Sequence, residues 1–567
     1  MALHPNTMTK LTLILLLATP CLSTATQNSA MENSAEQNAA AQQAAPETDP
    51  AVDPEVDPAV DLEAQTFLEA VKQGKTQLVK DLLKSNKNVD RVDATGSTAL
   101  HEAAWAGYTE IGTALIEHGA GIDKGNKSGD TPLLVAAEQG HVDFVNMLLD
   151  KGARLRAENE QGVNALIHAA YEGHVDVMKV LIEHGLDINA TDDDGATPLI
   201  NALNGKQGEA ARFLVGKGAD ISARDEFDNT ALLVAARNDD AETVKRLIDK
   251  GVDLGEQDSV NNTALIYAIW KKNAELVDVY LKHGVSIESQ FVQGARPLMV
   301  AAGLGDMEML EFFVEKGAEI DAADGSGATA LIYAARQNKP EAAEYLLKRG
   351  ANIDHADRQG RNALAIAATL GQADAMKVLL KGKIDIEKKD AMGRSALMWA
   401  TEHTRTDAAL LLIEHKADPN TRNGKNVTPL MRAGTLGATK IGTALLDKGA
   451  DINAKSDGGV TALIFAALAG KAPMVELLIK RGADVNQLDD YGRSALFYAA
   501  GNGFMNITRV LLEKGANPSV VDTQKKTAID YALESDKMPV VDLLREHGGK
   551  AAAELATQNK VSATETH

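Results

Sequence analysis

Histidine is the side chain best suited to proton transfer near neutral pH, and the chain contains thirteen histidines. Their spacing does not place them with a nucleophile or with a set of metal ligands. Two of them, His141 and His174, each follow a Gly at one position of a repeated pattern. Five more stand at another repeated position, directly before a Gly or a Lys: His118, His184, His283, His415 and His547. We interpret these histidines as structural parts of a repeat.

The motifs that carry catalysis or hold a cofactor are absent from the sequence. It contains no Gly-x-x-x-x-Gly-Lys-Ser/Thr phosphate loop, no Gly-x-Ser-x-Gly turn and no His-Glu-x-x-His pair. Cys21 is the only cysteine, which excludes an intrachain disulfide and a cysteine-based metal site. The acidic runs at 192–194 and 489–490 lie in turn-rich segments without the ligand spacing of a known calcium loop. We therefore expect no enzyme activity, no cofactor and no bound metal.

Aromatic residues favour binding over catalysis, because Trp and Tyr are the types that dominate binding hot spots. They recur at two positions of the repeat, and all three tryptophans are among them. The first position holds Tyr267, Tyr333, Trp399, Phe465, Tyr498 and Tyr531. The second holds Trp105, Tyr171 and Trp270. We predict partner contact at the second position. At the first, both partner contact and packing between neighbouring helices remain open.

The elements that position these residues follow from a period of 33 residues. A register Leu or Ile recurs at this interval from Leu100 to Ile529 with no insertion. Three residues after each of them comes an Ala, from Ala103 to Ala532, which indicates two helices too close together for a larger side chain. A second apolar block follows about fifteen residues after each register position.

Each unit is predicted to be a helix, a turn, a second helix and a glycine stop. A Thr, Ser or Asn stands two residues before nearly every register position, where its side chain caps the start of a helix. A Gly closes most second helices. The turn-rich residues between units predict a hairpin-like finger. Lys383 and Lys416 replace the closing Gly in two adjacent units, so we expect the stack to be irregular there.

This pattern resembles the ankyrin repeat. The resemblance is clearest at 98–104, which reads Thr-Ala-Leu-His-Glu-Ala-Ala, and at the Gly-His pairs 140–141 and 173–174. Later copies replace the motif His with other residues, among them Leu134 and Met299, so its hydrogen bonds are not expected in every repeat.

The resemblance implies an all-α solenoid of about fifteen helix-turn-helix repeats over residues 62–549. It also implies a protein-recognition scaffold without catalysis. The concave face of such a stack is made by the fingers and by one side of the first helices. The candidate aromatic residues are expected on that face.

The N-terminus has the parts of a secretory signal peptide: Lys10, an apolar run at 11–18 and small residues at 23–25. We predict a signal peptide over 1–25 and an exported protein, periplasmic or extracellular. The run is shorter than the ~20 residues that span a bilayer, so no stable membrane span is expected. Cys21 leaves lipidation open beside removal with the signal peptide, although Pro20 precedes it where lipoproteins carry a small residue.

The segments that flank the array have the composition of disordered chain. Residues 26–61 form an acidic leader rich in Ala, Gln and Pro, with too few apolar residues to offset the entropy of ordering. Residues 550–567 are predicted to be a disordered C-terminal tail.

The formal net charge of −22 argues against nucleic acid and against anionic lipid as partners. We predict an exported, monomeric, non-catalytic scaffold that binds a protein partner through its concave face. Two alternatives remain: a secreted effector that acts on host-cell proteins, and a regulatory subunit of an enzyme complex.

Overall fold

The computed structural model describes residues 66–85 and 88–557, so the predicted signal peptide and acidic leader lie outside the described residues. Within the described residues, short helices follow one another in pairs, and the chain forms isolated β-bridges but no strand. The expected all-α fold of helix-turn-helix repeats is confirmed. The chain divides into two units, one ending at Ser286 and the other starting at Ile287.

The first unit contains seven helix pairs in its described residues, about half of the fifteen or so repeats that the sequence predicted for the whole array. Its helices are 66–72, α4 (Thr76–Leu83), α5 (Ala99–Ala106), α6 (Thr109–Glu117), α7 (Pro132–Glu138), α8 (Val142–Asp150), α9 (Ala165–Glu172), α10 (Val175–Glu183), α11 (Pro198–Asn204), α12 (Gly208–Lys217), α13 (Ala231–Asn238), α14 (Ala241–Asp249), α15 (Ala264–Trp270) and α16 (Ala274–Lys282).

The second unit contains eight pairs in its described residues, preceded by a short 3-10 helix. Its helices are η1 (Val292–Gly294), α17 (Pro297–Leu304), α18 (Met307–Glu315), α19 (Ala330–Arg336), α20 (Pro340–Lys348), α21 (Ala363–Leu370), α22 (Ala373–Lys381), α23 (Ala396–Glu402), α24 (Thr406–Glu414), α25 (Pro429–Leu436), α26 (Thr439–Asp447), α27 (Ala462–Leu468), α28 (Ala472–Lys480), α29 (Ala495–Gly501), α30 (Met505–Glu513), α31 (Ala528–Glu534) and α32 (Met538–Glu546).

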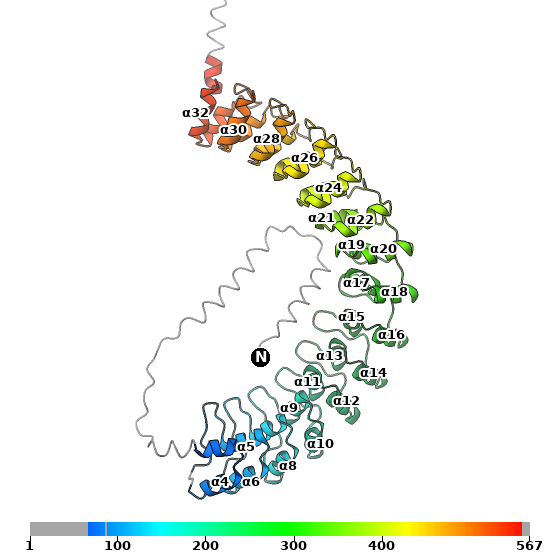
Figure 1. The fold of residues 1–567 in the computed structure, drawn as a ribbon, viewed down its shortest axis with the longest axis vertical. Helices are drawn as coiled ribbons and strands as arrows, with labels where there is room; N and C mark the ends of the chain where they lie inside the picture. Colours follow the sequence, from blue (N-terminus) through cyan, green and yellow to red (C-terminus); the bar gives the residue numbers. More distant parts are fainter. Residues whose placement is uncertain (1–65, 86–87, 558–567) are drawn as a thin grey trace, which may run out of the picture. The chain divides into compact units, whose positions relative to one another are not determined.

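Helices of seven to ten residues are marginal in water, so packing between pairs must hold them. In each unit the odd-numbered helices of neighbouring pairs contact one another, and the even-numbered helices form a second layer (Figure 1). The Ala three residues after each register position, from Ala103 to Ala532, has no exposed surface. The close approach of helices predicted from this column is confirmed.

Capping side chains begin the first helix of a pair as the sequence indicated. The side chain of Asn362 accepts the N–H of Ala365 at 3.0 Å at the start of α21. Thr197 and Thr428 stand at the same place before a Pro that begins the helix. Because the four first N–H groups of a helix lack partners within it, these caps fix where each first helix begins.

The closing position of the second helix departs from one expectation. Lys383 and Lys416 adopt the left-handed conformation of the glycines they replace, with φ of 63° and 66°. The helices on either side keep their contacts, since α22 packs on α24 and α24 on α26. The expected irregularity is therefore wrong. A side chain fits there because the position faces open space: a Cβ added at Gly350, the same position one repeat earlier, meets nothing within 4 Å.

The end of the array also departs from the prediction. Residues 552–557 form a helix, although a disordered tail was expected from 550. The N–H of Ala552 donates to Asp530 Oδ2 at 3.0 Å, and Arg545 pairs with Glu554 at 3.3 Å. These contacts hold a segment of helix-forming Ala, Glu and Leu against α31, which the composition alone did not show.

The histidines carry backbone contacts, which confirms their structural interpretation. At each of the five second-helix positions, Nδ1 lies 2.8–3.0 Å from the main-chain oxygen four residues earlier: His118, His184, His283, His415 and His547. In the motif copy, His101 Nδ1 accepts the N–H of Thr98 at 3.1 Å and Nε2 donates to the carbonyl of Asp130 at 2.9 Å. Met299 takes over the first of these contacts, with its sulfur 3.4 Å from the N–H of Arg296.

Candidate functional site

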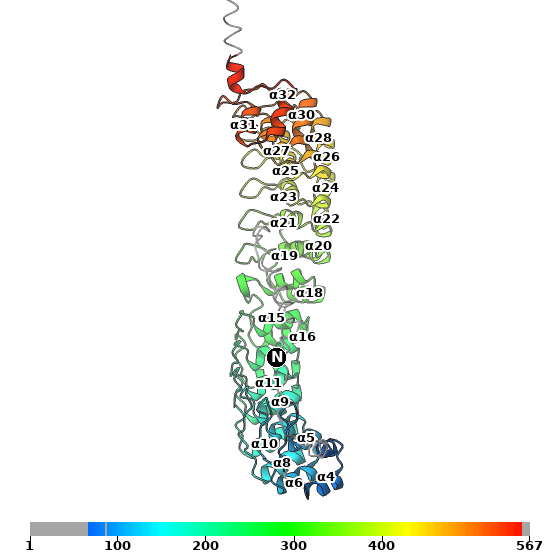
Figure 2. The same cartoon turned by 90° about the vertical axis from the view of Figure 1, so that its left-hand side faces the viewer.

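The fingers between helix pairs form a linked edge within each unit. Four of them are closed by an antiparallel bridge, such as that between Ala356 and Asn362. Adjacent fingers are joined by a main-chain hydrogen bond, for example from Ala391 N–H to the carbonyl of Gln359 at 2.9 Å. Figure 2 shows the fingers projecting from one side of the helix pairs α19 to α26. We call the fingers, together with the exposed side of the odd-numbered helices, the finger face.

In most repeats the finger turn is built around an Asp or Asn side chain. Asp390 Oδ1 accepts the N–H of Met392 at 2.8 Å and of Arg394 at 2.9 Å. Asn423 Oδ1 makes the same two contacts in the next finger, at 2.9 and 3.0 Å. These bonds replace a backbone partner for the turn and fix its shape. In the Asp versions, the second carboxylate oxygen is left to bind another group.

That second oxygen binds an aromatic side chain on the following helix. The hydroxyls of four tyrosines and the indole N–H of Trp399 donate to an Asp nine residues earlier, at 2.6–3.1 Å. The pairs are Asp258 with Tyr267, Asp324 with Tyr333, Asp390 with Trp399, Asp489 with Tyr498, and Asp522 with Tyr531. Burial and the Asp489 carboxylate raise the pKa of Tyr498 to about 12, so the hydroxyl stays protonated and donates.

These pairs were not predicted from the sequence. Acidic residues of the fingers were interpreted as turn residues, and the aromatic residues as surface or packing residues. The constant spacing of nine residues between the two columns was the signal that could have joined them.

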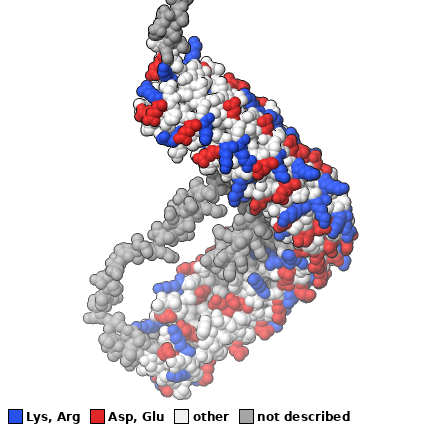
Figure 3. Space-filling model, turned by 45° about the horizontal axis from the view of Figure 1, so that its top comes forward, with Lys and Arg blue, Asp and Glu red and all other residues white. Residues whose placement is uncertain are grey.

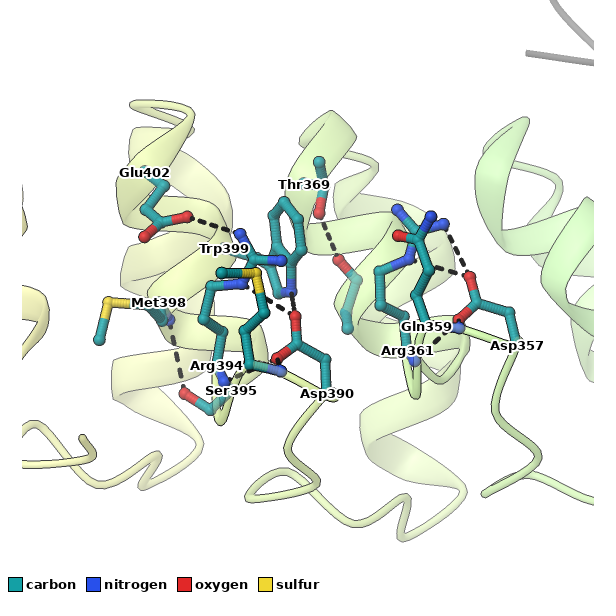
Figure 4. A network of polar contacts seen from close by, with 12 residues as sticks. Asp357, Gln359, Arg361, Thr369, Asp390, Arg394, Ser395, Met398, Trp399 and Glu402 are labelled. Atoms are coloured by element: carbon teal, nitrogen blue, oxygen red, sulfur yellow. Dashed lines mark hydrogen bonds and ion pairs between the residues drawn. The ribbon is translucent and has the colours of Figure 1, made fainter. Parts of the chain in front are cut away.

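The densest part of this pattern lies on α21 and α23 and their fingers (Figure 4). The guanidinium of Arg394 lies 3.7 Å from the ring centroid of Trp399 and donates to Asp390 Oδ2 at 2.9 Å. Arg361 pairs with Asp357 at 2.7 Å and lies 5.9 Å from the same ring. The indole is thus held between two arginines whose charges are balanced by buried carboxylates.

Glu402 extends this network along α23. Its two oxygens pair with Arg394 at 3.4 Å and with Arg432 of the next repeat at 2.9 Å. The network therefore couples three consecutive repeats of the second unit through side chains. Its geometry positions and braces the finger face, and its ionisable groups pair with one another.

The structure separates the candidate aromatic residues into exposed and packed ones. Trp105 is 60% exposed, the largest fraction among the candidates. Tyr333 and Trp399 are buried, with 3% and 7% exposed, and packing is the role that the structure describes for these two. The others are half-buried: Tyr171, Tyr267, Trp270, Phe465, Tyr498 and Tyr531.

The exposed and half-buried candidates do not form one cluster in the first unit. Trp105 lies on α5 and Tyr171 on α9, with α7 packed between those helices. Trp270, on α15, makes an edge-to-face contact with Tyr267, and the ring centroids are 5.5 Å apart. Contact with a partner remains a prediction for these side chains, spread along several repeats of the finger face.

Charge on the fingers differs between the two units. In the first unit, exposed acidic residues lie on three consecutive fingers: Glu158, Glu160, Asp193, Asp194, Glu226 and Asp228. The third of these fingers also exposes Arg224, which pairs with half-buried Glu256 of the next finger at 3.8 Å. In the second unit, exposed finger residues include Arg358, Lys389, Lys425 and Lys455. Figure 3 shows groups of Lys and Arg lying between groups of Asp and Glu on one face of the molecule.

Among residues 66–85 and 88–557, no group of three or more His, Cys, Asp and Glu side chains is placed to hold a metal ion. The described helices include none that is both long enough and apolar enough to cross a membrane.

Comparison with known proteins identifies the family. A family model described as ankyrin repeats (3 copies) matches seven overlapping segments that together run from residue 67 to residue 554: 67–159, 154–225, 223–291, 271–357, 351–423, 418–489 and 463–554. No curated protein matches the chain. Ankyrin repeats are a protein-interaction scaffold, and the linked fingers and helix pairs described above are the surface that such a scaffold offers. The chain belongs to the ankyrin-repeat family.

Proposed function

We propose that this protein is an exported, non-catalytic scaffold that binds a protein partner through its finger face. The observation that carries the proposal is Trp105, which is 60% exposed on a helix of the array. His141 Nε2 donates to the main-chain oxygen of Trp105 at 2.9 Å and so fixes the backbone that presents the indole. A large exposed ring on a fixed backbone loses little entropy on binding, which is what a hot spot requires.

The non-catalytic part of the proposal is supported by how the ionisable groups are used. The carboxylates and arginines of the finger face pair with one another or with backbone groups, as Asp390 does with Arg394. The histidines of the second helices contact main-chain oxygens. Groups committed to structure in this way are not poised for proton transfer to a substrate.

Export rests on residues 1–25, and it is tested by the N-terminus of the mature protein. Peptide mass spectrometry of the protein from its source cells is expected to find Thr26 as the first residue, in a periplasmic extract or in the medium. A protein that retains residues 1–25 in the cytoplasm contradicts export. Recovery from the medium or a host cytosol, and not from the periplasm, favours the secreted-effector alternative.

The binding proposal is tested by capture of a partner from source-cell extracts, followed by measurement of its Kd with purified protein. Changing both Trp105 and Trp270 to Ala is expected to weaken binding by about tenfold or more, as the loss of hot-spot residues does. The control is Leu78→Ala, an exposed apolar residue (41%) on the second helix of the first pair. Equal affinity of the double variant and the control contradicts the proposed surface.

A further inference from the structure

Three consecutive fingers of the second unit carry a basic residue at the same position: Lys389, Arg422 and Lys455. Each side chain reaches to the next finger and donates to a main-chain carbonyl there. Lys389 Nζ lies 3.0 Å from the oxygen of Arg422, Arg422 Nη1 lies 3.0 Å from that of Lys455, and Lys455 Nζ lies 3.2 Å from that of Leu488. We call these three side chains the basic rail.

The positive charge of the basic rail is not balanced by the contacts that order it. The carbonyl acceptors are neutral, so each cation is held in place and keeps its charge. Exposed Arg358 and Lys425 add to it from the fingers 355–361 and 421–427. The carboxylates of Asp357 and Asp390 are buried and already paired with Arg361 and Arg394, so they do not cancel it. Exposed Glu387, two residues before Lys389, offsets part of the charge at the start of the rail.

The third finger limits the extent of the rail. Asp457 is exposed there, and its Oδ1 accepts from the side-chain amide of Asn426 at 2.7 Å. Beyond it, Asp490 is exposed in the next finger. On the fingers 355–361, 388–394 and 421–427 the exposed charged residues are therefore basic, within a chain whose formal net charge is −22.

We propose that the basic rail binds an acidic, extended segment of the protein partner. The proposal rests on the proposed function and adds the chemistry of the partner. Charge complementarity selects an acidic ligand, and side chains already ordered by hydrogen bonds lose little entropy on binding.

The geometry also sets the spacing of the ligand's charges. Neighbouring helices pack about 8–10 Å apart, and an extended chain advances about 3.3 Å per residue. Consecutive rail residues therefore match an acidic side chain at about every third position. A nucleic acid is the less favoured ligand, because the net negative charge of the chain opposes binding of a polyanion over a long surface.

The test measures fluorescence anisotropy of a labelled peptide that repeats Asp-Ala-Ser, with the full mature chain. The wild type is expected to bind it, more weakly as salt rises, and not to bind the matched peptide that repeats Lys-Ala-Ser. The triple variant Lys389→Gln, Arg422→Gln, Lys455→Gln is expected to weaken binding by about tenfold or more. The control is Lys381→Gln, Lys448→Gln, Lys480→Gln, which removes the same charge from exposed residues of the second-helix layer and is expected to bind like the wild type.

Four results overturn the proposal. Two concern the acidic peptide: the wild type does not bind it, or the rail variant and the control variant bind it with equal affinity. The other two concern the ligand: the wild type binds a thymidine oligonucleotide more tightly than the acidic peptide, or it binds only a peptide with the sequence 47–62 of this chain. The last would make the chain's own acidic segment the ligand. The proposed function fails separately, if partner capture does not depend on Trp105 and Trp270. If partner capture depends on the two tryptophans but the chain does not bind the acidic peptide, this inference is wrong and the proposed function stands.

Discussion

At the scale of single residues, the finger carboxylates are the side chains that accept the most hydrogen bonds in the finger network. Asp390 accepts two main-chain N–H groups, the indole N–H of Trp399 and the guanidinium of Arg394. Its side chain is 1% exposed, so the indole N–H and the two main-chain N–H groups lose their partner if the carboxylate is removed, and Arg394 keeps only Glu402. Leaving buried donors unpaired costs more free energy than the bonds themselves contribute.

Changing Asp390 to Ala is therefore expected to lower the free energy of unfolding by about 3 kcal/mol, since it leaves the indole N–H and two main-chain N–H groups unpaired and removes one of the two carboxylates that pair with Arg394. The matched change Asn423→Ala removes two main-chain bonds and no ion pair, and is expected to cost about 1 kcal/mol. Urea unfolding followed by circular dichroism measures both. Equal losses would show that the Arg394 and Trp399 contacts contribute nothing.

The motif histidine makes the stability of the first unit depend on pH. Burial holds the pKa of His101 below its ordinary value of 6.5, so the unfolded chain binds that proton more readily than the folded one. The stabilising contribution is complete above about pH 6.5 and is lost as the pH falls toward the lower pKa of the folded state.

The variant His101→Leu, which has the residue found at Leu134 in the next repeat, is expected to remove this part of the pH dependence. The measurement is the Tm of both proteins between pH 7.5 and pH 5, within the range in which histidine titrates. The wild type is expected to lose more Tm on acidification than the variant. Parallel curves would mean that His101 does not titrate differently on folding.

At the scale of the elements, the position that closes each second helix requires a positive φ and little else. Glycine reaches that conformation without strain, whereas a residue with a Cβ is held there at a cost of about 1–2 kcal/mol. Lys416 occupies it with φ of 66°, and Gly350 with φ of 94°. Both are exposed, so the cost lies in the backbone.

Exchanging the two residue types tests this directly. Lys416→Gly is expected to raise the free energy of unfolding by about 1 kcal/mol, and Gly350→Lys to lower it by a similar amount. The midpoint of urea unfolding is expected to move in opposite directions for the two variants. A loss of stability in Lys416→Gly would indicate a contact of the lysine side chain that outweighs the backbone strain.

Most of the elements could be predicted because each is specified locally. The Ala column, the capping Thr or Asn and the closing Gly fix the helix pairs within one period of sequence. The side-chain contacts between different positions of the repeat could not be predicted from these local signals. Asp390 and Trp399 meet because the finger folds back on the next helix, and Met299 replaces a histidine contact that no propensity describes. The helix 552–557 likewise depends on Asp530, which lies about twenty residues earlier.

At the scale of the whole molecule, each repeat contacts mainly its neighbours, so the array offers surface in proportion to its number of repeats. The finger face carries an exposed tryptophan and acidic fingers in the first unit, and a basic rail in the second. A partner can therefore be recognised by several separate contacts, each presented on hydrogen-bonded fingers. The affinity of such a complex depends on how many of these contacts are made together.

The most direct test of this account is hydrogen–deuterium exchange of the full chain with and without its captured partner. The account predicts that the partner slows exchange in fingers and odd-numbered helices, including α5 with Trp105, and leaves the even-numbered helices unchanged. Protection confined to even-numbered helices such as α6, α8 and α10, with the fingers unaffected, would contradict it.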